Sequence, residues 1–103
     1  MGNIGYGFSP THPGEVIKDE IEYRGVSQRQ LAKQMGISYT VLNDILNKRR
    51  PVTAGTALLF EAALGINADI FMRLQLKYNM QTARQDQTLA QRLEEVRKMT
   101  KVV

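Results

Sequence analysis

The polar side chains of residues 39–47 are the part of this chain best suited to contact DNA bases. Asn43 can pair bidentately with adenine, and Thr40 can offer its methyl group to thymine or its hydroxyl to other bases. Asp44 can accept from cytosine N4, although an ion pair with Lys48 four residues later is the favoured interpretation. An outward asparagine or threonine on a helix is more often only solvated, so base contact depends on the surrounding elements.

Basic side chains are concentrated in the same part of the chain. Residues 24–50 hold six basic residues and one acid, whereas residues 1–23 hold one lysine and four acids. The net charge is +4, and its distribution favours phosphate contact near residues 24–50. The Lys-Arg-Arg run can equally be a solvated loop. The candidate DNA-binding residues are Gln28, Arg29, Ser38, Tyr39, Thr40, Asn43, Asp44, Asn47, Lys48, Arg49 and Arg50, with Lys33 as a further phosphate candidate.

The spacing of residues 28–45 predicts a helix-turn-helix that would position these side chains. Gly36 can adopt the left-handed conformation that ends one helix and turns into the next. Ala32 is small where the second helix must cross the first, and Leu42 and Ile45 point into the crevice between the two helices. In this arrangement one helix lies across the phosphates while the other enters the major groove.

Capping residues and apolar spacing predict an all-α chain. Ser27 and Gln30 have the pattern of a capping box, and Ser38, Thr53 and Asn67 are expected to cap the later helices. The predicted parts are a flexible N-terminal segment (1–10), a five-helix domain (11–80) and a C-terminal amphipathic helix or tail (81–103), with a helix over about 87–99 after a polar stretch at 81–88 that is expected to bend.

Two apolar stripes are more than a core of this size is expected to absorb. They consist of Ile70, Phe71, Leu74 and Tyr78 in the fifth helix and Leu89, Leu93 and Val96 in the last helix. We therefore predict a homodimer whose interface uses these residues. Packing of the tail inside its own chain is the alternative.

Catalytic, metal and membrane functions find little support. The chain has no cysteine and one histidine, His12, which is expected to be a surface or helix-capping residue. We predict no enzyme activity, no cofactor and no metal site. No apolar run approaches the roughly 18 residues of a membrane span, and no secretion signal is recognisable, so a cytoplasmic location is expected. The acidic stripe, defined as Glu15, Asp19 and Glu22, is interpreted as a solvated face or a docking face for a basic partner.

With its flanks, the helix-turn-helix resembles the HigA-type antitoxins, within the Cro/C1-type (XRE-like) group. The resemblance covers about residues 11–80. The segments that carry it are T-H-P-G-E-V-I, S-Q-R-Q-L-A-K-Q-M-G-I-S, L-N-K-R-R-P-V-T-A-G-T-A-L and A-L-G-I-N-A-D-I-F-M-R-L-Q-L-K-Y-N. Two positions depart from the family pattern: Phe71 stands where a tryptophan is common, and Asp44 stands where a neutral or basic residue is usual.

The resemblance implies a lambda repressor-like fold and a double function. The protein would neutralise a co-encoded RelE-like mRNA-cleaving toxin and, as a dimer on double-stranded operator DNA, repress its own operon. Because a toxin acting on mRNA must carry a basic face, the acidic stripe is the candidate toxin-binding surface, with the C-terminal helix as the competing surface. A stand-alone Cro/C1-type transcriptional repressor without a toxin is the alternative function.

Overall fold

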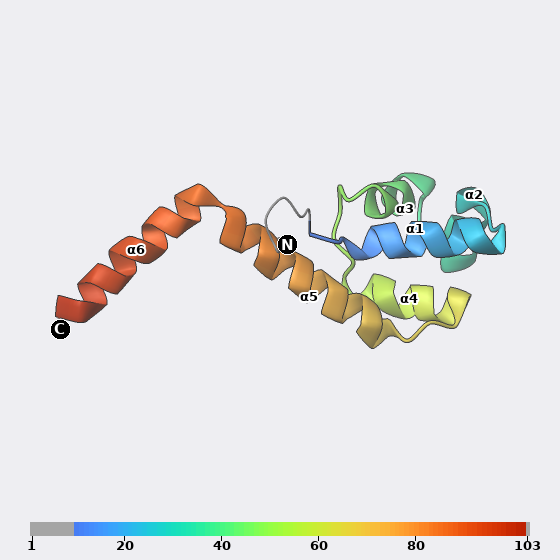
Figure 1. The fold of residues 1–103 in the computed structure, drawn as a ribbon. Helices are drawn as coiled ribbons and strands as arrows, with labels where there is room; N and C mark the ends of the chain where they lie inside the picture. The colour runs from blue at the N-terminus through green and yellow to red at the C-terminus, as the bar shows by residue number, and fades with distance from the viewer. Residues whose placement is uncertain (1–9, 103) are drawn as a thin grey trace.

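The computed structural model describes residues 10–102. These residues form six α-helices joined by short connections and contain no β-strand. The helices are α1 (Pro13–Arg24), α2 (Gln28–Met35), α3 (Tyr39–Leu46), α4 (Ala54–Leu64), α5 (Ala68–Gln85) and α6 (Gln87–Val102) (Figure 1). The all-α prediction, with five helices and an additional C-terminal helix, agrees with this architecture. The segment predicted to be flexible, residues 1–10, lies outside the described residues except for Pro10.

Serine caps and a glycine turn define the helix-turn-helix. Ser27 Oγ accepts from the backbone N–H of Gln30, and Ser38 Oγ accepts from that of Val41, both at 3.1 Å. Gly36 ends α2 with φ 70°, a conformation that a β-carbon disfavours. The capping box predicted at Ser27 is wrong in its second half, because the Gln30 side chain makes no return bond to the Ser27 backbone.

The core lies among α1 to α5. The inward stripe predicted for α3 is confirmed, since Leu42, Ile45 and Leu46 are all buried. Phe60 of α4 and Phe71 of α5 meet edge to face, with ring centroids 5.8 Å apart. The other buried apolar residues are Ile17, Ile21, Leu31, Ala32, Met35, Val52, Ala57, Leu64 and Ala68. The buried side of α3 therefore fixes this helix against the core and leaves its other side exposed to solvent.

Gly14 allows α1 to lie against the backbone of α3. A β-carbon built on Gly14 would lie 1.9 Å from the backbone oxygen of Ile45. The backbone N–H of Gly14 also donates to Nδ1 of His12, the residue that caps α1, at 2.9 Å. Glycine is thus required here by close approach rather than by a turn.

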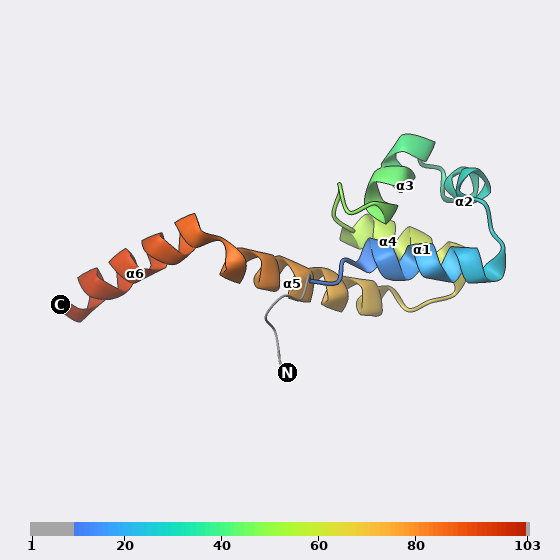
Figure 2. The same cartoon turned by 45° about the horizontal axis from the view of Figure 1, so that its top comes forward.

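The C-terminal part of α5 and the whole of α6 form an arm that extends from the five-helix body (Figures 1 and 2). The predicted bend is confirmed and falls at Asp86, whose backbone is extended (ψ 113°). α5 continues to Gln85, so the predicted domain boundary after residue 80 lies inside this helix, and α6 runs beyond the expected end at Met99. None of the described helices is long and apolar enough to span a bilayer.

Candidate nucleic-acid interface

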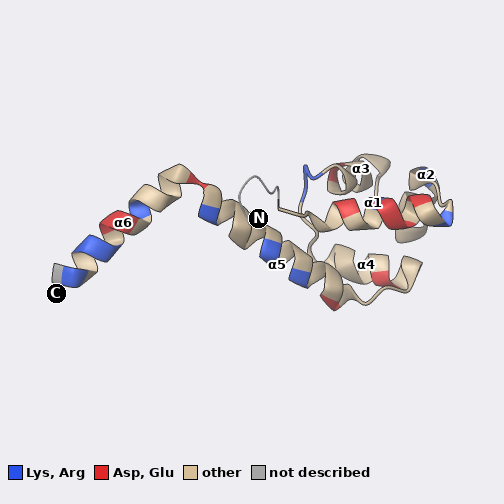
Figure 3. Cartoon of the chain, in the orientation of Figure 1, with Lys and Arg blue, Asp and Glu red and all other residues tan. Residues whose placement is uncertain are grey.

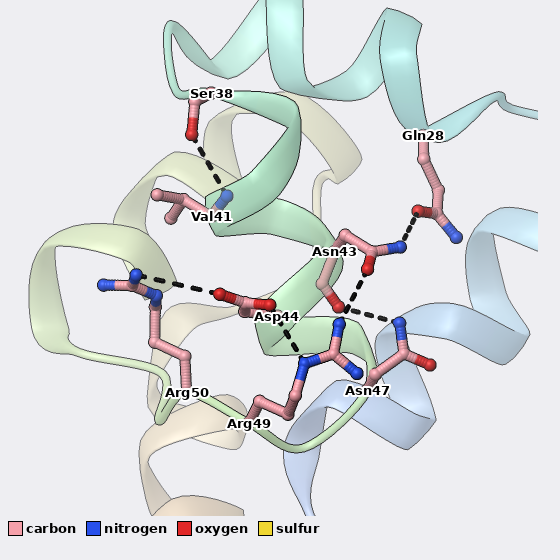
Figure 4. Close-up of polar contacts among 8 residues, drawn as sticks. All are labelled: Gln28, Ser38, Val41, Asn43, Asp44, Asn47, Arg49 and Arg50. Carbon is pink, nitrogen blue, oxygen red and sulfur yellow. Dashed lines mark hydrogen bonds and ion pairs between the residues drawn. The ribbon is translucent and has the colours of Figure 1, made fainter.

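Asn43, on the outer side of α3, is hydrogen-bonded both to the start of α2 and to the residues that follow α3 (Figure 4). Asn43 Nδ2 donates to Gln28 Oε1 at 3.1 Å, and Asn43 Oδ1 accepts from a terminal guanidinium nitrogen of Arg49 at 2.9 Å. Asn47 Nδ2 donates to the backbone carbonyl of Asn43 at 2.8 Å. The amide of Asn43 is therefore held in one orientation at the surface between the two helices.

The basic connector, residues 47–53 between α3 and α4, folds back on Asp44. Asp44 Oδ1 accepts from Arg49 Nε at 3.0 Å, and Asp44 Oδ2 lies 3.8 Å from Arg50. The predicted pairing of Asp44 with Lys48 is wrong. α3 ends at Leu46 and Lys48 has a positive φ of 66°, so the helical geometry that would bring the two side chains together is lost.

The N-terminal end of α3 presents further candidate contacts to solvent. The Arg29 guanidinium lies 4.5 Å from the ring centroid of Tyr39, a cation–π contact between α2 and α3. Tyr39 is 40% exposed, and Thr40 is also exposed. The Ser38 oxygen accepts a hydrogen bond as the cap of α3, and its hydroxyl proton can still donate to a phosphate. The structure thus brings the predicted DNA-binding residues to one region around α3.

The acidic stripe of α1 lies beside the basic connector (Figure 3). Glu15, Asp19 and Glu22 line a groove of about 410 Å³ whose other side is formed by the end of α3 and by Lys48. Glu15 has a second role, because its Oε2 accepts from the backbone N–H of His12 at 3.0 Å and completes the capping box of α1. The three acids share one face of α1, as their spacing predicted, and only Asp19 and Glu22 have no part in the cap.

A family model described as helix-turn-helix matches residues 17–71, which span α2, α3 and the core that supports them. The chain belongs to this helix-turn-helix family. Its resemblance to the HigA-type antitoxins is also confirmed. An addiction module antidote protein of a HigA family from Coxiella burnetii has 30% identity, covering 85% of this chain and 95% of that chain, with a TM-score of 0.74.

Two further relatives support the same assignment. The Pseudomonas aeruginosa antitoxin HigA, solved with the higBA promoter, has 29% identity, covering 84% of this chain and 92% of that chain, with a TM-score of 0.74. Virulence-associated protein I of Dichelobacter nodosus is 34% identical over 76 residues, which is 73% of this chain and 70% of the relative. This family and fold are those of DNA-binding regulators and antitoxins rather than of enzymes.

The predicted dimer residues fall into three environments in this helix-turn-helix protein. Phe71 is fully buried against Phe60, so its prediction as interface surface is wrong for this conformation. Leu74, Tyr78 and Leu89 are partly buried. The exposed members are Ile70, Leu93 and Val96, at 46%, 41% and 57%. Most of the apolar stripe of α5 therefore packs against the core of its own chain, whereas Leu93 and Val96 of the α6 stripe are exposed.

His12 is a helix cap, as predicted, but it is not a surface residue. It is 2% exposed, and its ring meets the Tyr78 ring edge to face at 4.8 Å. Burial lowers the pKa of His12, against the opposing effect of the nearby Glu15 carboxylate. The neutral imidazole is the form that leaves Nδ1 free to accept from the backbone N–H of Gly14.

Gln75 is a buried polar residue that the sequence analysis missed. It is 4% exposed, and its Oε1 accepts from the backbone N–H of Val52 in the basic connector at 2.8 Å. The spacing in the sequence could have indicated its burial, because Phe71, Gln75 and Tyr78 stand at i, i+4 and i+7 and so share one face of α5. A glutamine at a core-facing helical position predicts a buried hydrogen-bond partner.

Proposed function

We propose that this protein is an antitoxin that binds operator DNA through α2 and α3 to repress its own operon, and that it neutralises a co-encoded RelE-like mRNA-cleaving toxin. The DNA-binding part rests above all on the fixed Asn43 amide, flanked by Gln28 and Arg49. Relatives of similar sequence and fold, among them an antitoxin solved with its promoter, support the same function. The toxin-binding part rests on the family and on the acidic stripe.

The amide of Asn43 has the capacity left for base contact. One Nδ2 hydrogen is used by Gln28, which leaves the second to donate to adenine N7. Oδ1 has two lone pairs, so it can accept from adenine N6 while it keeps its bond to Arg49. Tyr39 and Thr40 would contact neighbouring bases. Hydrogen bonds made before DNA arrives reduce the side-chain entropy that binding costs.

Phosphate contacts would surround this base-reading centre. Gln28 and Arg29 lie in the first turn of α2, where free backbone N–H groups also attract anions. Lys48, Arg49 and Arg50 lie at the other end of α3, on the basic connector. Asp44 pairs with the two arginines and would repel phosphate. The guanidinium groups would therefore contact phosphates on the side that faces away from Asp44.

Operator binding is tested with two substitutions that separate base reading from phosphate contact. Asn43→Ala should lose about 1–3 kcal/mol of operator binding and relax the preference at one base pair. Arg49→Ala should weaken binding to random DNA and flatten the salt slope by about one unit, and it should weaken operator binding somewhat more because Arg49 also orients the Asn43 amide. Both effects are measured by titrating labelled duplexes at several salt concentrations.

Arg73→Ala is the matched control for Arg49→Ala. Arg73 is an exposed arginine on α5, outside the helix-turn-helix, and its removal should change neither affinity nor salt slope. Equal binding of the wild-type protein to operator and random DNA at physiological salt would contradict the proposed DNA-binding function.

A homodimer would place two copies of α3 on an inverted repeat about one helical turn apart. The apolar stripe of α6, formed by the partly buried Leu89 and the exposed Leu93 and Val96, is the proposed interface. Leu93→Asp should raise the dimer dissociation constant by at least about tenfold, because it would bury an unpaired carboxylate. Sedimentation is the measurement, with Gln91→Asp on the opposite side of α6 as control. An unchanged dimer in the Leu93 variant would exclude this interface.

A further inference from the structure

The buried amide of Gln75 connects α5 to the basic connector. Its Oε1 accepts from the backbone N–H of Val52 at 2.8 Å, and its Nε2 donates to Asn79 Oδ1 at 2.9 Å. Val52 is itself 2% exposed. The bond joins positions 23 residues apart in the chain, so it is a tertiary contact and not a local cap. It fixes the connector two residues after Arg50.

The beginning of the connector is fixed separately, by α3. The backbone N–H of Asn47 donates to the Asn43 carbonyl at 3.0 Å, and that of Arg49 donates to the Asp44 carbonyl at 2.8 Å. The segment that carries the three basic side chains is thus attached to α3 at one end and to α5 at the other.

An apolar side chain at position 75 could fill the same space. It would leave the N–H of Val52 buried without an acceptor, which the connector can relieve only by moving that N–H toward water. Such a movement would shift Arg49 and Arg50, whose guanidinium groups now lie on either side of Asp44. The Gln75 amide therefore fixes the position of the connector. Packing α5 into the core would not by itself require an amide at this position.

We infer that Gln75 is a positioning residue for DNA binding, which holds the basic connector so that Arg49 and Arg50 meet the phosphate backbone together with α3. This inference rests on the proposed binding of operator DNA. Gln75 does not touch the DNA in this arrangement. Its effect passes through the Val52 N–H to the connector, and from there to the two guanidinium groups.

The test compares variants that differ in whether they keep the acceptor for Val52. Gln75→Met removes it at similar volume, and Gln75→Asn keeps an amide but shortens its reach by one methylene. Both should weaken binding to operator and random DNA by about tenfold at physiological salt and flatten the salt slope by about one unit, as expected for a lost phosphate contact. Gln75→Glu keeps an oxygen for Val52 but buries a charge beside Asn79, so it should recover only part of the affinity and salt slope that the methionine variant loses.

Asn79→Ala is the matched control, because it removes the partner of the Gln75 Nε2 and leaves the Val52 bond in place. It should bind DNA with the wild-type affinity and salt slope. Melting curves of all variants show which are folded at the binding temperature. If the methionine variant does not fold, the asparagine variant decides the question by itself.

The outcomes separate this inference from the proposed function. Wild-type protein that shows no preference for operator DNA would overturn the proposed function. Wild-type preference, with folded Gln75→Met or Gln75→Asn protein that keeps the full affinity and salt slope, would overturn only the positioning role. A lower melting temperature with unchanged DNA binding would likewise make Gln75 a purely structural residue.

Discussion

Gly14→Ala is expected to lower the melting temperature by about 10–20 °C, because the added methyl group would clash with the backbone of α3 in a packed core. Its β-carbon would lie 1.9 Å from the Ile45 oxygen and 2.9 Å from the Ile45 carbonyl carbon. Backbone atoms cannot rotate away as a flexible side chain can. α1 must therefore move away from α3, although Ile17 and Ile45 are both fully buried between the helices.

The same substitution at Gly55 is the control. Gly55 lies in the first turn of α4, and a β-carbon there meets nothing within 4 Å. Gly55→Ala should therefore raise stability by about 0.4–1 kcal/mol, because it reduces the conformational freedom of the unfolded chain. Thermal unfolding followed by circular dichroism compares the two variants. A melting temperature for Gly14→Ala at or above the wild-type value would contradict the close approach of α1 to α3.

This clash also has a consequence for DNA binding. Ile45 belongs to the helix that carries Asn43, and the Gly14 N–H donates to the cap of α1. Displacement of α1 would disturb both the position of α3, against which Gly14 packs, and the His12 cap of α1. Folded Gly14→Ala protein should accordingly bind operator DNA more weakly than Gly55→Ala protein.

Local signals in the sequence were sufficient to predict the helix-turn-helix. Ser27 and Ser38 act on backbone N–H groups three residues away, and Gly36 acts through its own φ angle. The inward positions of α3 follow from helical periodicity alone. Each of these features is determined within a few residues, so a single sequence contains the information that predicts them.

Contacts between distant segments could not be predicted in the same way. Periodicity indicates that Gln75 and Gly14 face inward, but not that the first meets Val52 and the second meets Ile45. The pairing of Asp44 failed for a related reason. The choice between Lys48 and the two arginines depends on the positive φ of Lys48, which ends the helical spacing on which the prediction relied.

Charge changes in the acidic stripe are expected to slow association with the proposed co-encoded toxin by about 10- to 100-fold at low salt, because complementary charge mainly accelerates encounter. The stripe lines one groove on α1, and a toxin that cleaves mRNA, as proposed, would carry a basic face to bind that substrate. The expected effect should diminish as salt rises. Stopped-flow mixing of the two purified proteins is the measurement.

The capping role of Glu15 determines which substitutions to use. Asp19→Lys and Glu22→Lys reverse two exposed charges, whereas Glu15→Gln removes the third charge but keeps an oxygen for the His12 N–H. α1 should therefore stay folded, as an unchanged melting temperature would show. Preference for operator over random DNA should also persist, because Asn43 lies on α3 and is not altered.

Glu94→Lys with Glu95→Lys is the control, since it reverses two exposed charges on α6 rather than on α1. These changes should leave the rate of toxin association close to that of the wild type. The C-terminal helix is the competing surface for the toxin, and removal of residues 84–103 tests it directly. Toxin binding that tolerates the changes on α1 but is lost when residues 84–103 are removed would exclude the acidic stripe and place the toxin on α6.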